Sequence, residues 1–362
     1  MLIDRSANND SPATKEGYLK YSRRKTGFII ACTVLLVALS IVTIGLGSTG
    51  LSLSEIIHYI FHPDGSWSST VVWDLRLKYV FTAIAAGAAL GIAGAVMQSI
   101  LRNPLASPFT LGLSNAAAFG ASLAIIFMDA GVFVSNSSGY DINNTAAVTI
   151  MAFLFAMVAT GVMLLMVKMT ECTPETIVLA GMAISSIFSA GLAFLQYIAS
   201  DVALSAIVYW QFGSLSKASW DNLAIIVIAL LAISSYFLYK RWDLNAMESG
   251  EDVARGLGVN IRLTRFLVLT LSAVLTAIVV SFCGVIGFIG LVGPHIVKRL
   301  VGNDNRYVLV GSIVMGALVM LLSYVVGTYV IFPTIPVGII TSAIGGPLFI
   351  AILLKGRRRS TV

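Results

Sequence analysis

The residues able to carry out chemistry are few, and their spacing argues against an enzyme. The histidines are His58, His62 and His295, and only the first two are close enough to share one face of a helix. These two precede Pro63 in a polar turn, where a solvated pair is more common than a metal site. The three cysteines lie far apart and outside any CxxC spacing, which argues against a zinc site or a disulfide framework. We therefore expect no catalytic site, no metal and no cofactor.

Acidic residues are absent from the apolar stretches and occur only between them or at their ends. A transporter driven by protons or sodium usually places a carboxylate near mid-membrane, where an ion must bind. The sequence also lacks the GxxxxGK[ST] loop that cradles nucleotide phosphates. If this chain moves a solute uphill, its energy must come from another polypeptide. An ion-coupled secondary transporter is the main alternative, and a membrane-embedded enzyme or a structural subunit is a third.

The composition is that of an integral membrane protein. Of the 362 residues, 57% are apolar and only 11% are charged, against about 25% charged in a typical soluble domain. The formal net charge of +6 is better explained by basic cytoplasmic loops than by nucleic-acid binding. The apolar stretch that begins at Phe28 is long and poorly terminated, so we expect a retained first span and not a cleaved signal sequence.

Ten apolar segments approach the length of about 20 residues that a transmembrane helix needs. The break near residue 282 rests only on Cys283 and Gly284, so nine spans is the competing count. We expect an all-α polytopic membrane protein with about ten transmembrane helices. The segments fall at about 28–47, 79–101, 109–128, 146–168, 175–198, 222–240, 264–281, 283–300, 307–331 and 336–354.

The distribution of Lys and Arg predicts the direction of the chain. With ten spans and both basic ends in the cytoplasm, only Arg76, Lys78 and Lys217 lie outside. Spans 2–5 and 7–10 then run in opposite directions, as in the inverted repeats of transporters. The expected organisation is a cytoplasmic tail at 1–27, a transmembrane domain at 28–354 and a basic cytoplasmic tail at 355–362. That last tail is expected to contact anionic lipid, and the protein to be a multi-pass component of the plasma membrane.

The longest connection between inside ends, residues 242–262, has the character of a docking element. Its sequence predicts two short helices joined at Gly250, with Gly256 and Gly258 ending the second. Alternating charges with a few apolar anchors are typical of an amphipathic helix that binds a partner. A solvated surface helix fits the local composition equally well. The anchors are Leu244, Met247, Val253 and Leu257.

Several motifs follow one another in order over about residues 28–355. They are Asp74-Leu75-Arg76-Leu77, Gly87 to Gln98, Arg102 to Pro108, Leu111 to Ala117, Val178 to Ala183, Tyr209 to Leu215, Glu251 to Val259, Gly284 to His295 and Ile335 to Ile339. Taken together, this set resembles the FecCD-type permeases, the membrane subunits of ABC importers for iron chelates, haem and vitamin B12. The chain is similar to the vitamin B12 importer permease of that group.

The resemblance implies the fold of a type II ABC importer permease with an inverted repeat. It implies three protein partners: a cytoplasmic ATP-binding subunit dimer, a second permease subunit and an extracytoplasmic substrate-binding protein. ATP would be hydrolysed by the partner. A ferric siderophore is the expected solute, so the chain would serve iron transport, with haem or cobalamin as alternatives. A heterodimer of two related permeases is favoured over a homodimer because the docking motif is incomplete.

The resemblance also assigns roles to positions of this sequence. Those expected to couple the chain to the ATPase are Glu248, Gly250, Glu251, Arg255, Gly256, Leu257 and Gly258. Those expected along the translocation pathway are Gly181, Ser185, Ser189, Gln196, Gln98 and Asn115. The first four of these fall within about 80° of one helical face, and a small-residue packing surface explains them equally well. For Gly87, Gly91 and Gly94, packing is the favoured reading.

Docking of the binding protein is expected to involve Arg76 and Lys78. Arg76 resembles the first arginine of an Arg-Leu-Pro-Arg stretch that pairs with acids on the binding protein in relatives. Here Lys78 replaces the proline and Tyr79 the second arginine, and Gly327 stands where some relatives have a further arginine. A surface ion pair contributes only about 0–1 kcal/mol, so several would have to act together.

Overall fold

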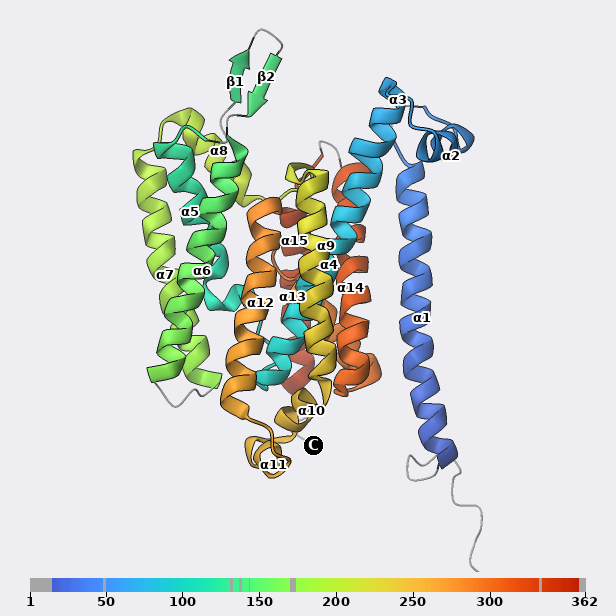
Figure 1. Ribbon diagram of the computed structural model, residues 1–362, viewed down its shortest axis with the longest axis vertical. Helices are drawn as coiled ribbons and strands as arrows, with labels where there is room; N and C mark the ends of the chain where they lie inside the picture. Colours follow the sequence, from blue (N-terminus) through green and yellow to red (C-terminus); the bar gives the residue numbers. More distant parts are fainter. Residues whose placement is uncertain are drawn as a thin grey trace, which may run out of the picture.

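The computed structural model describes residues 15–47, 50–130, 133–136, 139–142, 144–169, 174–331 and 334–357. Residues 1–14 and 358–362 of the two predicted tails lie outside the described residues. So do Cys172 and Thr173, which lie between the predicted segments 146–168 and 175–198. Within the described residues the all-α expectation is confirmed, with one short β-hairpin between helices (Figure 1).

Each of the ten predicted apolar segments contains a helix. Seven helical stretches of the described residues are long and apolar enough to cross a membrane. The other three segments hold α5 and α15, whose apolar stretches Leu113–Phe127 and Val337–Ala351 are shorter, and the 13-residue α13. The ten helices are α1 (Lys15–Gly45), α4 (Lys78–Ile100), α5 (Leu113–Phe127), α6 (Thr145–Met169), α7 (Pro174–Ile198), α9 (Trp220–Tyr239), α12 (Ile261–Cys283), α13 (Ile289–Val301), α14 (Asn305–Val325) and α15 (Val337–Arg357).

The connecting elements gather at two opposite ends of the molecule (Figure 1). One end carries α2 (Leu53–Phe61), α3 (Trp67–Thr70), α8 (Asp201–Gln211) and the hairpin of β1 (Phe133–Asn136) with β2 (Gly139–Ile142). The other end carries α10 (Arg241–Ser249) and α11 (Glu251–Gly256). We call these the hairpin end and the α10–α11 end. Short π and 3₁₀ segments complete the chain: η1 (Val71–Leu77), η2 (Pro108–Leu111), η3 (Leu215–Lys217) and η4 (Val326–Val330).

Helix α4 is the central helix, and small residues let its neighbours approach it closely. Nearly all of its residues are buried. A Cβ at Gly87 would overlap the carbonyl of Gly316 on α14, and one at Gly94 would overlap the carbonyl of Gly290 on α13. Gly91 lies against Ser312 in the same way. The prediction that these glycines form a packing surface is confirmed, as expected for membrane helices held by close backbone contact.

The weak break near residue 282 is a true interruption, which favours ten segments over nine. Helix α12 ends at Cys283, and Gly284 and Phe288 both adopt left-handed φ values of 76° and 66° before α13 starts. A Cβ at Gly284 would overlap the carbonyl of Trp210, so only glycine fits there. At 13 residues, α13 is about 20 Å long and shorter than the ~30 Å hydrocarbon core. The non-helical backbone before it is tolerated because protein surrounds it.

Candidate functional site

The segment expected to couple the chain to an ATPase forms the two short helices that its sequence predicts. Only Lys240 separates α9 from α10, and Gly250 makes the corner between α10 and α11 with φ 133° and ψ 152°. The second helix ends at Gly256, and Gly258 follows in the left-handed region with φ 79°. The helical pattern is therefore confirmed, while the coupling role stays a prediction.

A buried polar cluster ties α10 to three membrane helices. The Lys298 ammonium of α13 donates to Glu248 Oε1 at 3.2 Å and to the Ser99 hydroxyl at 3.3 Å. Asn305, at the start of α14, donates from Nδ2 to Glu248 Oε2 at 3.1 Å and accepts from Ser99 at 2.9 Å. Ser99 and Asn305 are fully buried, and the Glu248 and Lys298 side chains are 17% and 12% exposed. We call Ser99, Glu248, Lys298 and Asn305 the Glu248 cluster.

A second group of contacts fixes the same helix one turn earlier. Asn245 accepts from the backbone N–H of Asn305 at 2.7 Å and donates to Asp304 Oδ1 at 3.1 Å. Asp304 also receives the guanidinium of Arg306, with an Nη2 to Oδ2 distance of 2.6 Å. The first turn of α14 is thus bonded to α10 through side chains on both elements. A displacement of α10 must therefore move α14 or break these bonds.

Glu251, on the other short helix, makes a corresponding contact with α12. Its Oε1 accepts from Arg265 Nη2 at 2.7 Å, and Arg255 lies 3.6 Å from its Oε2. The hydrogen bond from Arg265 holds the pKa of the Glu251 carboxyl below its usual range. Arg265 is buried while Arg255 is largely exposed. The two acids singled out from the sequence thus point inward and fasten α10 and α11 to the bundle.

The outer side of the same helices is apolar and exposed. Trp242, Val253 and Leu257 are about half or more exposed, with Leu257 at 69%. Together with residues of α10 they line a shallow groove of about 370 Å³ between the two helices. Exposed apolar side chains around a groove are typical of a protein-binding surface. Of the four apolar anchors named from the sequence, Val253 and Leu257 lie on this exposed side, whereas Leu244 and Met247 are buried inside the chain and cannot contact a partner.

The four α7 residues predicted to line the pathway fall into two groups: two pack against neighbouring elements and two are exposed or half-buried. A Cβ at Gly181 would overlap the carbonyl of Thr110, and Ser185 accepts from Asn115 Nδ2 at 2.7 Å, so both residues serve helix packing. Ser189 is exposed, and Gln196 is half-buried. Their role along a pathway stays a prediction. Gln98 lies inside the bundle, where its Nε2 donates to the Leu291 carbonyl at 3.3 Å.

Arg76 and Lys78 differ in their surroundings. Arg76 is 4% exposed, and its Nη1 donates to the carbonyl of Ile44 at 2.9 Å near the end of α1. This contact gives Arg76 a structural role, because it satisfies a carbonyl that the helix end leaves unpaired. Lys78 is half-buried with its ammonium 5.4 Å from the centre of the Tyr79 ring. Docking of a binding protein through these two residues stays a prediction.

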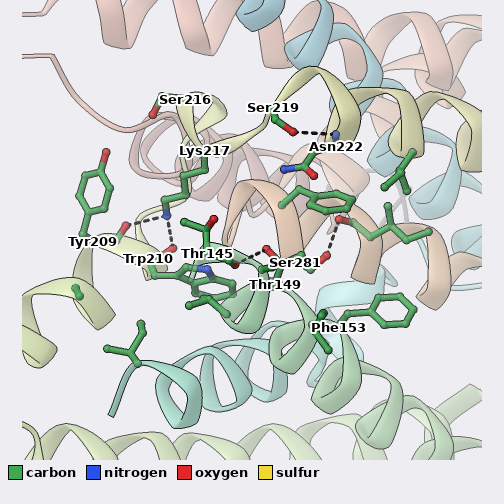
Figure 2. A pocket seen from close by; sticks show the side chains of 18 of the residues that line it. Thr145, Thr149, Phe153, Tyr209, Trp210, Ser216, Lys217, Ser219, Asn222 and Ser281 are labelled. Carbon is green, nitrogen blue, oxygen red and sulfur yellow. Dashed lines mark hydrogen bonds between the residues drawn. The ribbon is translucent and has the colours of Figure 1, made fainter. Parts of the chain in front are cut away.

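Two features escaped the sequence reasoning. The first is the Glu248 cluster, whose members lie at the ends of separate apolar segments as isolated polar residues. The second is a cavity of about 1260 Å³ at the hairpin end, between α6, α8, α9 and α12, shown in Figure 2. Lys217 reaches into it. The only hint of Lys217 in the sequence was that it is one of three basic residues predicted to lie outside the cytoplasm.

Comparison with known proteins places these features in a family. The family model described as the FecCD transport family matches residues 35–355. A Methanocaldococcus jannaschii protein named as an ABC transporter permease is 41% identical over 94% of this chain and 98% of its own length. The molybdate import system permease of Haemophilus influenzae is 33% identical over 91% of this chain and 96% of its own.

A solved structure shares the fold. It is described as an inward-facing conformation of a metal-chelate type ABC transporter, and it is 31% identical in sequence with a TM-score of 0.77. The match covers 91% of this chain and 99% of that chain. The arrangement of helices is therefore that of an ABC importer permease.

Proposed function

Because the chain belongs to the FecCD transport family and is a permease subunit of an ABC importer, we propose that it forms the membrane passage for a ferric siderophore. A separate ATP-binding subunit, present as a dimer on the cytoplasmic side, supplies the energy. The α10–α11 end faces the cytoplasm with both chain termini, and the hairpin end faces outward. An extracytoplasmic binding protein delivers the solute to the hairpin end, with Arg76 and Lys78 near its docking surface.

The observation that carries the coupling proposal is the two-sided character of α10 and α11. Their outer side offers Trp242, Val253 and Leu257 to a partner. Their inner side is bonded through Glu248 and Glu251 to α12, α13 and α14. A movement of the ATP-binding subunit would therefore be passed to the membrane helices as a rigid-body displacement. Gly250, Arg255, Gly256 and Gly258 shape the segment that makes this contact.

A second permease subunit would cover the exposed face of α7. Leu179, Ile187, Phe194 and Tyr197 of this helix are 63% to 87% exposed. Ser189 and Gln196 lie on the same helix, so they would line a pathway between two such subunits. The incomplete arginine motif at Arg76 favours a related but different partner chain, and thus a heterodimer.

The solute is assigned to the iron chelates because the structural relative is described as metal-chelate type. The molybdate permease among the relatives shows that the family also carries other solutes. Haem and cobalamin are the alternative cargoes. An ion-coupled secondary mechanism is less well supported, because acidic residues are missing from the interior of the spans.

Reconstitution tests both parts of the proposal. The full chain is placed in liposomes with its partner permease, its ATP-binding subunit and its binding protein, and uptake of radiolabelled ferric siderophore is measured. Uptake should require ATP and persist in the presence of a proton ionophore. Uptake that collapses with the ionophore and needs no ATP would overturn the energy source. ATP-driven uptake of haem, cobalamin or molybdate in place of the siderophore would overturn the assigned cargo alone.

A further inference from the structure

The cavity at the hairpin end is mostly apolar and contains one charged side chain. Its walls come from α6, α8, α9 and α12, and the described residues that line it include no acid (Figure 2). No residue of α7 or α15 takes part. At about 1260 Å³ the cavity exceeds the ~300–1,000 Å³ of ordinary small-molecule pockets. It has room for an elongated amphiphile.

Polar and apolar side chains both line the cavity. Lys217, Ser219 and Asn222 lie at or just before the start of α9, at the hairpin end. Apolar side chains make up most of the remaining wall, with a few hydroxyls among them. Along α6 the lining runs from Thr145 to Phe153, eight residues and thus about 12 Å along the helix. A ligand that fills this space needs a polar group at one end and a hydrocarbon chain at the other.

Lys217 supplies the positive charge at the polar end. Its ammonium donates to the carbonyls of Tyr209 at 3.2 Å and Trp210 at 3.1 Å, which leaves the third N–H for a ligand (Figure 2). Among the described residues, no carboxylate forms a salt bridge with it. The Asn222 amide also lines the cavity but lies apart from Lys217 (Figure 2). An anionic oxygen would complete this arrangement, because a charged acceptor makes the stronger hydrogen bond.

The level of Lys217 in the molecule matches a lipid headgroup region. Trp210 lines the same cavity, and Trp220 begins α9 three residues later. Tryptophan and tyrosine are enriched where the hydrocarbon core meets the polar headgroups. Apolar side chains such as Ile150, Ile225 and Ile278 then lie at acyl-chain depth.

We propose that this cavity is a binding site for one anionic phospholipid of the leaflet at the hairpin end, with the lipid phosphate on Lys217 and an acyl chain along α6 and α12. The occupant is a lipid and not a free phosphate, because most of the cavity lining is apolar. The proposal is independent of which solute the importer carries. A lipid bound here would bridge α6, α8, α9 and α12.

Native mass spectrometry of the purified full-length chain in nonionic detergent tests the site. Palmitoyl-oleoyl phosphatidylglycerol is titrated in, with the phosphatidylcholine of the same chains as the zwitterionic probe. One tight phosphatidylglycerol adduct should form, at about tenfold lower lipid concentration than with phosphatidylcholine, because the choline ammonium of the latter repels Lys217 and offsets the attraction of its phosphate. Glycerol 3-phosphate, which has the headgroup charge without chains, should not bind.

Variants assign the adduct to the cavity. Lys217→Gln should remove the preference for phosphatidylglycerol, and Lys217→Arg should keep it. Lys78→Gln deletes a charge at the same end but outside the cavity lining, and should leave the lipid preference unchanged. Ala206→Trp fills the apolar part with Lys217 intact and should abolish the tight adduct. Equal retention of the two lipids by the wild type, or unchanged preference in Lys217→Gln, would overturn the proposal.

Discussion

The Glu248 cluster allows a quantitative test of how α10 is fastened to the membrane helices. Glu248→Ala removes the acceptor of two hydrogen bonds, at 3.2 Å from Lys298 and 3.1 Å from Asn305. The Lys298 side chain is only 12% exposed, so in the variant its charge has no counter-ion and little solvation by water. Breaking a buried ion pair by removing one partner costs about 3–5 kcal/mol. Because both side chains keep some exposure, we expect the lower end, about 3 kcal/mol of the free energy of unfolding.

A double-mutant cycle separates the pair from its surroundings. The cycle compares Glu248→Leu, Lys298→Met and the double variant, in which about 2 kcal/mol of the summed loss should be recovered, since apolar residues of similar volume can substitute for a buried pair. The pair of Lys240 and Asp243 is the matched control. It lies on the same connection with an N to O distance of 2.7 Å, but both side chains are about 30% exposed. Lys240→Met should therefore cost no more than about 1 kcal/mol.

The assay is denaturant unfolding of the full chain in detergent micelles, followed by reconstitution of the complete importer. Folded Glu248→Ala protein should still stimulate ATP hydrolysis, while the uptake per ATP falls, because α10 no longer moves with α13 and α14. Two results would refute this reasoning. One is a loss of stability as small as that of Lys240→Met. The other is strict additivity in the double variant.

Three further predictions concern other parts of the molecule. Gly94→Ala should destabilise the protein by more than about 2 kcal/mol, because the new Cβ overlaps the Gly290 carbonyl. The control is Gly161→Ala on α6, whose new Cβ meets no atom within 4 Å and which should be neutral or stabilising by up to about 1 kcal/mol. Equal melting temperatures for the two variants would contradict this explanation of α4 packing. Glu251 has a lowered pKa in the folded state, so the stability from its contact with Arg265 is fully present above the ordinary pKa of about 4.5 and is lost as the pH falls through the lower folded pKa. The melting temperature should therefore drop on acidification. Glu251→Gln should flatten that part of the curve of melting temperature against pH. Burial lowers the pKa of Lys217 to about 8, and the Tyr209 and Cys283 side chains are its titratable neighbours. The preference for phosphatidylglycerol should therefore fade as the pH rises from 7 to 9.5. A preference that is constant over this range would exclude the ammonium as the partner of the anion.

The order of spans and the two short helices of the 242–262 connection could be predicted from the sequence. The apolar segments are long and uniform, and a helix is the one conformation that satisfies their backbone groups locally in lipid. The corner at Gly250 was also predictable, because a φ of 133° is open to glycine and strained for other residues. These features depend on short stretches of chain, so no distant contact is needed to specify them.

The inward or outward direction of each polar side chain was decided by the tertiary structure alone. Gly181 and Ser185 share a helical face with Ser189, yet the neighbouring η2 and α5 cover the first two and leave the third exposed. Ser99, Lys298 and Asn305 are separated by up to 206 positions and meet only because α4, α13 and α14 cross at one level. Local sequence fixes which residues lie on one helix, while the partner of a buried polar group depends on how several helices cross. The sequence alone therefore predicts the membrane fold and the two short helices of the 242–262 connection, and the three-dimensional packing decides which charges hold that connection in place.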